Sequence, residues 1–289
     1  MRVLITGSGG FLGRYLTPLL AAHDVLCLVR STEGNNTSAV RQVAGDLTTD
    51  GPWQQAVEEF APEWCFHLAW DGLPDYSLER CRANLDANVG LIQTLARAGV
   101  RRVVVAGTCW EYGRTHGPQR EDATPVDCGV FAATKHAVRA MLDAVARECG
   151  FDYRWARVFF AYGAGQRGSS LIPHLRDSLT SGTPPAVREP AALQDFIHVA
   201  DVARGLLALA QCDAASGVYN LGSGEATSVG AVANLVARHY GRSPAFAATS
   251  TGTGFWADMS RTTAATGWRP TTGLAAGIDL TLRAMDEAA

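Results

Sequence analysis

Residues Met1–Gly13 read MRVLITGSGGFLG, and this stretch decides the fold of the chain. Val3-Leu4-Ile5 is an apolar run, rich in β-branched residues, that predicts a buried strand. From Phe11 to Leu20 the apolar residues recur at helical spacing. The segment between them is rich in glycine, so the chain is expected to begin with a strand, a tight turn and a helix.

The glycines of this turn stand at positions 7, 10 and 13, a spacing of Gly-x-x-Gly-x-x-Gly. In a turn that binds a dinucleotide, Gly7 would allow the sharp bend and Gly10 would let the backbone approach a pyrophosphate. Gly13 would let the helix pack close to the strand. The helix N-terminus would offer free N–H groups and a partial positive charge to the phosphates. The stretch therefore predicts dinucleotide binding.

Composition narrows the class of protein further. The chain has 289 residues, of which 18% are charged and 47% hydrophobic, enough for one or two ordered domains. The net charge of −3 gives no reason to expect a nucleic acid or an anionic membrane as partner. Seven scattered cysteines without a CxxC pair favour reduced thiols and a cytoplasmic location. No apolar run has membrane-spanning length, and the immediate strand argues against a signal peptide.

Strands and helices alternate along the first part of the chain, which predicts an α/β fold with a doubly wound parallel sheet, the Rossmann fold. The pattern changes after Gly163, where we expect shorter strands, with Asp201 as the N-cap of a helix over 202–210. The predicted strands are 25–29, 43–47, 64–69, 102–106 and 154–158, and the main helices are 52–60, 78–98 and 130–148. We predict a dinucleotide-binding domain of residues 1–158 and 195–222 and a smaller, discontinuous substrate lobe of residues 159–194 and 223–289.

The end of the second strand bears on the choice of cofactor. An acidic residue there would hold the ribose hydroxyls of NAD, whereas an arginine accommodates the 2′-phosphate of NADP. This chain has Arg30, which favours NADP(H). Asp46, after the third strand, is interpreted either as an adenine contact or as a turn aspartate. His67 lies in an apolar run and is interpreted as structural.

The loop WDGLPDYS, residues 70–77, leaves the carboxyl end of the fourth strand. Ligands of open α/β sheets bind at that edge, so Trp70 and Tyr76 are predicted to contact the substrate. Phe131 and Lys135 are four residues apart on a predicted helix and share one of its faces.

Together these residues resemble the extended short-chain dehydrogenase/reductase family, over nearly the whole chain. The chain is most similar to the bacterial reductases of nucleotide-linked 4-keto-6-deoxy sugars within that family. The motifs that carry the resemblance are TGSGGFLG (6–13), Asp46, HLAW (67–70), Asn84, Thr108 five residues before Gly113, Lys135, RVFFAYGAGQ (157–166), QDFIHVADVA (194–203) and GVYNLGSGEATSV (217–229).

The resemblance implies an NADPH-dependent reductase of a nucleotide-diphosphate sugar, with dTDP the expected nucleotide, no metal, and the homodimer common in the family. Thr108 would bind the carbonyl oxygen and Lys135 the nicotinamide ribose. The implied cofactor contacts are Gly7, Gly10, Phe11, Leu12, Gly13, Arg30, Asp46, Leu47, Leu68, Ala69, Trp70, Asn84 and Lys135. The implied substrate contacts are Trp70, Tyr76, Cys109, Trp110, Leu171, Ile172, Gln194 and Trp256.

Three positions depart from the family pattern. Phe131 stands where the family has its catalytic tyrosine, and Gln194 replaces an arginine that contacts the diphosphate. Cys109 and Trp110 occupy the positions of the Asp-Glu pair that sugar dehydratases use to eliminate water, which argues against dehydration.

Phe131 leaves three interpretations open, because its ring has no proton to donate. It is a deliberate Tyr→Phe substitution, or the protein uses another donor such as water, Thr108 or Tyr112, or the site is inactive and the protein is a nucleotide-binding sensor. A C-4 epimerase with tightly bound NAD is the alternative enzyme, and a non-catalytic NADP-binding regulator is the alternative outside enzymes.

Overall fold

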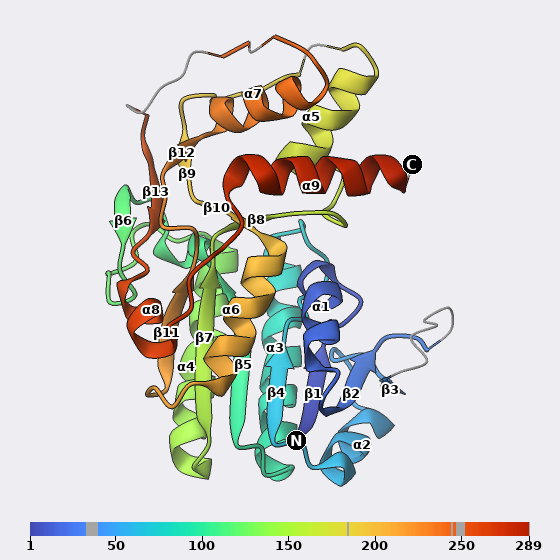
Figure 1. Ribbon diagram of the computed structural model, residues 1–289. Helices are drawn as coiled ribbons and strands as arrows, with labels where there is room; N and C mark the ends of the chain where they lie inside the picture. The colour runs from blue at the N-terminus through green and yellow to red at the C-terminus, as the bar shows by residue number, and fades with distance from the viewer. Residues whose placement is uncertain (33–39, 184, 244, 247–251, 289) are drawn as a thin grey trace.

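The computed structural model describes residues 1–32, 40–183, 185–243, 245–246 and 252–288 (Figure 1). Its main feature is a seven-stranded sheet in which every neighbouring pair of strands is parallel. The strand order, β11-β7-β5-β4-β1-β2-β3, reverses direction between β1 and β4, as in the Rossmann fold. The strands are β1 (Arg2–Thr6), β2 (Asp24–Val29), β3 (Arg41–Ala44), β4 (Trp64–His67), β5 (Arg102–Thr108), β7 (Asp152–Val158) and β11 (Gly217–Leu221).

Helices cover both faces of this sheet, which confirms the predicted doubly wound α/β architecture (Figure 1). Successive side chains of β1 show the principle: Leu4 packs into the core on one face, and Val3 and Ile5 into the core on the other. One face carries α2 (Pro52–Phe60), α3 (Leu78–Arg97) and α4 (Val130–Cys149), and the other carries α1 (Phe11–Leu16), the short helix η1 (Thr17–Leu20) and α6 (Val199–Gln211).

A second layer stands above the carboxyl ends of the main strands (Figure 1). Its helices α5, α7 and α9 enclose a separate hydrophobic cluster that contains Ile172, Val232 and Leu282. Two small sheets connect this layer to the main one. The elements are α5 (Leu171–Thr180), α7 (Val229–His239), α9 (Leu274–Glu287), the pair β8 (Phe160–Tyr162) and β10 (Phe196–His198), and the sheet β12 (Thr227–Ser228), β9 (Leu193–Gln194), β13 (Gly254–Ala257) and β6 (Gly117–Gln119).

The division into two lobes remains a prediction, and two elements connect the proposed parts. Strand β6 comes from the first predicted domain but pairs with β13. Helix α8 (Ser260–Thr266) comes from the predicted substrate lobe but packs against β11 and α6 of the main layer.

Several boundaries differ from the sequence-based expectations. Strand β3 ends at Ala44, so Asp46 lies in the turn after it, and β5 continues to Thr108. The predicted N-cap at Asp201 is wrong, because α6 begins at Val199 and the His198 ring accepts the hydrogen bond from the Ala200 N–H. Asp201 is buried in the first turn, where its carboxylate accepts the N–H groups of Thr271 and Thr272.

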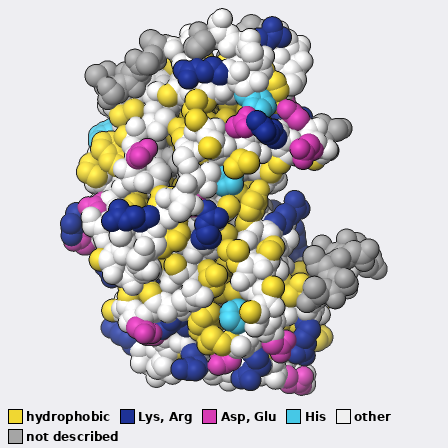
Figure 2. Space-filling view, in the orientation of Figure 1, with side chains coloured by type: hydrophobic (Ala, Val, Ile, Leu, Met, Phe, Trp, Pro, Cys, Tyr) yellow, Lys and Arg dark blue, Asp and Glu magenta, His cyan; other side chains and the backbone are white. Residues whose placement is uncertain are grey.

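The surface fits the low net charge. Basic and acidic side chains are interspersed over the face shown in Figure 2, with no field of one sign on that face. Among the described residues, no helix is long and apolar enough to cross a membrane. All seven cysteines lie in the described part of the chain, and all are free thiols.

Candidate active site

The glycine turn between β1 and α1 is held by close backbone contacts. Gly7 has φ +77°, and a Cβ there would lie 2.8 Å from the Ala69 nitrogen. A Cβ on Gly13 would lie 2.2 Å from the Gly7 oxygen and 2.6 Å from Ser8 Cα. Gly13 therefore lets the helix approach the turn itself, rather than the strand as expected. Gly10 is the N-cap of α1, and no side chain caps the first N–H groups of the helix.

Arg30 and Asp46 are the two residues predicted to contact the adenosine part of the cofactor. The Arg30 side chain follows β2, is 80% exposed, and forms an ion pair with Asp71 at 3.3 Å. The Asp46 carboxylate accepts from the Thr48 N–H at 2.8 Å and from the Thr48 hydroxyl at 2.7 Å. These two bonds hold the pKa of Asp46 below its ordinary value. Asp46 therefore closes a turn, and its contact with adenine remains a prediction. Leu47, which follows it, packs at the edge of the hydrophobic core.

His67 at the end of β4 has both ring nitrogens engaged. Nδ1 lies 2.6 Å from the Thr6 hydroxyl and Nε2 lies 2.8 Å from Asn88 Oδ1. Burial lowers the pKa of His67 to about 4, so the ring is neutral at pH 7. The structural interpretation of this histidine is confirmed.

The loop after β4 is fastened to helix α3. Asn84, buried on α3, accepts from the Asp71 N–H at 2.8 Å and donates to the Asp71 carbonyl oxygen at 3.0 Å. Arg80 forms an ion pair with the Asp71 carboxylate. Leu68, Ala69 and Trp70 directly precede Asp71. The backbone of Leu68 and Ala69 lies beside the glycine turn, where a Cβ on Gly7 would collide with it. The family asparagine thus shapes the loop that carries the predicted cofactor and substrate contacts.

Lys135 on α4 is buried beneath Trp70. Its Nζ donates to the Ala106 carbonyl oxygen at 2.9 Å and lies 4.1 Å from the centroid of the Trp70 ring. Burial lowers the pKa of Lys135 to about 8, while the negative charge of Glu111 acts in the opposite direction. An ammonium group has three donors, so two remain for a ligand.

Phe131 lies on the same face of α4 as Lys135, one turn closer to the N-terminus of the helix. Its ring centroid lies 5.2 Å from that of Trp70 and 5.0 Å from that of Tyr76. The tyrosine position of the family is therefore occupied by an apolar ring at the centre of an aromatic group, Trp70, Phe131 and Tyr76. Lys135 reaches this group through its contact with Trp70.

Thr108 ends β5 and caps the short helix η2 (Cys109–Tyr112). Its Oγ1 accepts from the Trp110 N–H at 3.3 Å, and its own N–H donates to Glu111 Oε1 at 2.8 Å. The Thr108 hydroxyl also interacts with the neighbouring Cys109 thiol, so a carbonyl oxygen would have to replace that thiol as the acceptor of its hydrogen.

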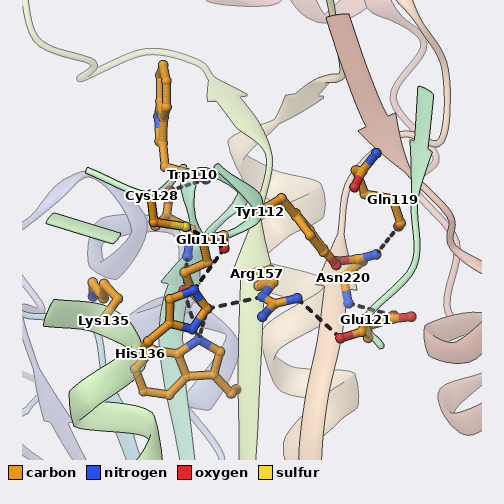
Figure 3. Close-up of polar contacts among 12 residues, drawn as sticks. Trp110, Glu111, Tyr112, Gln119, Glu121, Cys128, Lys135, His136, Arg157 and Asn220 are labelled. Carbon is orange, nitrogen blue, oxygen red and sulfur yellow. Dashed lines mark hydrogen bonds and ion pairs between the residues drawn. The ribbon is translucent and has the colours of Figure 1, made fainter. Parts of the chain in front are cut away.

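Sequence reasoning missed the residues that hold Thr108 in place. Glu111 is fully buried and accepts from Arg157 Nε at 3.0 Å and from Trp155 Nε1 at 2.9 Å (Figure 3). The signal was present in the sequence as one acid after β5 and two arginines, Arg154 and Arg157, in the otherwise largely apolar strand β7. Only the pairing of these strands, with Gly107 opposite Arg157, brings the two charges together.

Tyr112 is turned away from the proposed centre. Its hydroxyl donates to Asn220 Oδ1 at 2.7 Å, and Figure 3 shows the ring directed toward Asn220 and away from Lys135. Burial raises the pKa of Tyr112 to about 12. The suggestion that Tyr112 is the proton donor is therefore wrong.

The remaining predicted substrate residues fall into two groups. Trp110 and Leu171 are open to a ligand in part, and the Trp110 ring, 54% exposed, packs edge-on against Phe160. Cys109 and Ile172 are buried, and burial raises the pKa of the Cys109 thiol. Gln194 and Trp256 come together in one small sheet, where Gln194 pairs with the neighbour of Trp256.

Comparison with known proteins shows to which family the chain belongs. The profile of the NAD dependent epimerase/dehydratase family matches residues 3–222, which include the glycine turn, Thr108, Lys135 and the end of β11. The chain belongs to this family. The match covers most of the chain and ends where the main sheet ends.

Members of the epimerase/dehydratase family resemble the chain over most of its length. The dTDP-L-rhamnose 4-epimerase of Burkholderia thailandensis is 26% identical over 83% of this chain and 81% of its own. The dTDP-4-dehydro-6-deoxyglucose reductase of Escherichia coli is 23% identical over 98% of this chain and 97% of its own. The structure of MoeE5 in complex with UDP-glucuronic acid and NAD is 29% identical, with a TM-score of 0.86 over the full length of both chains.

Proposed function

We propose that this chain is a cytoplasmic, NADPH-dependent reductase of the 4-keto group of a nucleoside-diphosphate deoxysugar, with dTDP as the nucleotide. The relative from Escherichia coli that spans almost the whole chain is named for such a reduction. The proposal includes the homodimer and the two lobes expected from the sequence.

The residues around the glycine turn fit a dinucleotide. Side chains at Gly7 and Gly13 would fill the turn, so this part of the chain offers bare backbone where a pyrophosphate would lie. Lys135 has two unused donors for the nicotinamide ribose. The nicotinamide, when bound, would supply the hydride.

Arg30 supports NADP over NAD. Its guanidinium is exposed, and its ion pair with Asp71 is of the surface kind that contributes little, so a 2′-phosphate could replace that partner. No acidic residue directly follows β2 to bind the two ribose hydroxyls. The structure of MoeE5 contains NAD and gives no support for NADP. The proposed preference of this chain for NADP therefore rests on Arg30.

One observation carries the choice of reaction: an apolar ring, Phe131, occupies the tyrosine position while Thr108 and Lys135 are kept. An epimerase must first remove the proton of a sugar hydroxyl and so needs a base at this position. A reductase needs only a proton for a strongly basic developing alkoxide, which weaker donors can supply. Cys109 and Trp110, in place of an acid pair, argue against dehydration.

A C-4 epimerase is the second candidate. The names of the Burkholderia thailandensis relative and of the UDP-glucose 4-epimerases of Corynebacterium glutamicum and Neisseria gonorrhoeae favour it. Such an enzyme would keep NAD bound through its cycle, and its substrate would be a 4-hydroxy sugar.

The deciding experiment incubates the protein with NADPH and dTDP-4-keto-6-deoxyglucose and measures both NADP⁺ and the sugar product. Reduction predicts one NADP⁺ released for each C-4 alcohol formed. Interconversion of 4-hydroxy nucleotide sugars without net cofactor use would identify an epimerase. Cofactor binding with neither reaction would point to the non-catalytic regulator.

A further inference from the structure

Reduction of a ketone requires a proton, and the side chain at position 131 has none to give. The described part of the chain brings several other acidic groups near Thr108 and Lys135. Each has its own environment, and that environment decides whether it can reach a substrate oxygen.

Most of these groups are engaged elsewhere. The Tyr112 hydroxyl is bonded to Asn220 inside the protein, and Cys109 is buried. His67 is neutral with both nitrogens engaged. The Lys135 ammonium donates to the Ala106 carbonyl and lies against the Trp70 ring, and its two remaining donors are assigned to the nicotinamide ribose.

Thr108 is suited to a different task. Its hydroxyl can donate a hydrogen bond to the carbonyl oxygen, which orients and polarises that bond. An aliphatic hydroxyl is no stronger an acid than the sugar alcohol that forms, so it gains nothing by giving up its proton. A phenol is a much stronger acid than either, with an ordinary pKa near 10.

Tyr76 carries such a phenol, and it lies beside Phe131, the residue at the position of the family tyrosine. Its ring contacts the Phe131 ring at 5.0 Å, it is 47% exposed, and no described residue forms a hydrogen bond with its hydroxyl. The backbone around it is fixed: the Asp75 carboxylate accepts the Ser77 N–H, and the Tyr76 carbonyl accepts from the Cys81 thiol. The ring is therefore held against Phe131, and its hydroxyl has no hydrogen-bond partner among the described residues.

We propose that Tyr76 is the catalytic proton donor, supplying from the loop after β4 the phenol that Phe131 lacks. The proposal rests on the proposed reductase function. As C-4 of the sugar accepts hydride from the reduced cofactor, the carbonyl π electrons move to oxygen. The Tyr76 O–H bond breaks and its proton bonds to that oxygen, which leaves a C-4 alcohol. The phenolate then recovers a proton from water on its exposed side.

The test removes the hydroxyl and keeps the ring. Tyr76→Phe should lower kcat for dTDP-4-keto-6-deoxyglucose at least tenfold, because a positioned general acid contributes about 10²–10⁴-fold. Tyr76→Phe combined with Phe131→Tyr should regain most of that rate, because it moves the phenol to the neighbouring ring. Tyr240→Phe is the matched control: it removes the hydroxyl of a half-buried tyrosine, bonded to Asp286 on α9 in the second layer, and should leave kcat unchanged.

A binding measurement gives an independent readout. With NADP⁺ present, calorimetry should show that Tyr76→Phe binds dTDP-4-keto-6-deoxyglucose at least threefold more weakly, and dTDP alone as tightly as before. A packing role would leave both affinities and kcat intact, since the ring remains. An unchanged kcat in Tyr76→Phe, with reduction by the unmutated protein, overturns the assignment and leaves the reductase function standing. If the unmutated protein reduces no keto sugar, both proposals fall.

Discussion

Lys135 Nζ lies 4.1 Å from the centroid of the Trp70 ring, and the Phe131 ring packs against the same indole at 87°. An indole face attracts a cation electrostatically, and the attraction grows when water is excluded. The contact offsets part of the cost of burying an ammonium group, which also donates to the Ala106 carbonyl oxygen and lies 5.8 Å from the centroid of the Trp155 ring. This pair links the loop after β4 to helix α4, the two elements that carry the proposed chemistry.

The first prediction concerns the charge of Lys135. Burial lowers its pKa from 10.5 to about 8, so the folded protein releases this proton before the unfolded chain does. The cost of burying the charged ammonium therefore lowers the free energy of unfolding fully below about pH 8. That cost is relieved as the pH rises toward 10.5. The shift corresponds to about 3 kcal/mol. Lys135→Met should lose this rise in the free energy of unfolding, measured by urea titration at pH 7 and pH 10, and should also lose turnover. An identical pH dependence in both proteins would contradict it.

The second prediction tests the glycine turn. Gly13→Ala should abolish measurable dinucleotide binding, because its Cβ would lie 2.2 Å from the Gly7 oxygen and the helix would have to move away. Overpacking of this kind typically costs about 1–3 kcal/mol in stability as well. Gly9→Ala is the control, since a Cβ there meets nothing within 4 Å. Equal cofactor affinity in the two variants, measured by calorimetry, would argue against this geometry.

The third prediction concerns the preference for NADP(H). Arg30→Ala should weaken NADP binding by about 1.5–3 kcal/mol, the contribution of one charge-assisted contact, and leave NAD binding nearly unchanged. Arg41→Ala removes an exposed arginine from the adjacent strand and should change neither affinity. Equal or tighter binding of NAD by the unmutated protein would refute the preference.

The fourth prediction concerns the buried pair behind Thr108. Arg157→Met leaves the Glu111 carboxylate buried without its cation and should lower the free energy of unfolding by roughly 3–5 kcal/mol. Arg147→Met breaks an exposed ion pair with Asp143 and should cost less than about 1 kcal/mol. Denaturant unfolding of both variants measures the difference. Similar small losses would mean that the buried pair contributes no more than a surface pair.

The sequence alone determined the main layer of this protein. Continuous apolar runs, helices of 3.6-residue period and the glycines of the first turn are local patterns, so they predicted the parallel sheet and its cofactor edge. His67 could also be interpreted correctly, because a lone histidine in an apolar run is expected to be neutral and satisfied. Asp201 failed as an N-cap because its carboxylate bonds residues 271 and 272, seventy positions later, which no local pattern reveals.

The tertiary structure decided what surrounds the proposed centre. Glu111 and Arg157 meet because β5 and β7 are neighbours, and Tyr112 turns to Asn220 because β11 lies beside β7. Phe131 lies between Trp70 and Tyr76 because a loop anchored by Asn84 folds back onto α4. Side chains far apart in the chain acquire their pKa values and partners only when the fold removes water from between them. The sequence therefore determined the parallel sheet and the absence of a hydroxyl at Phe131. Only the fold placed Tyr76 beside Phe131.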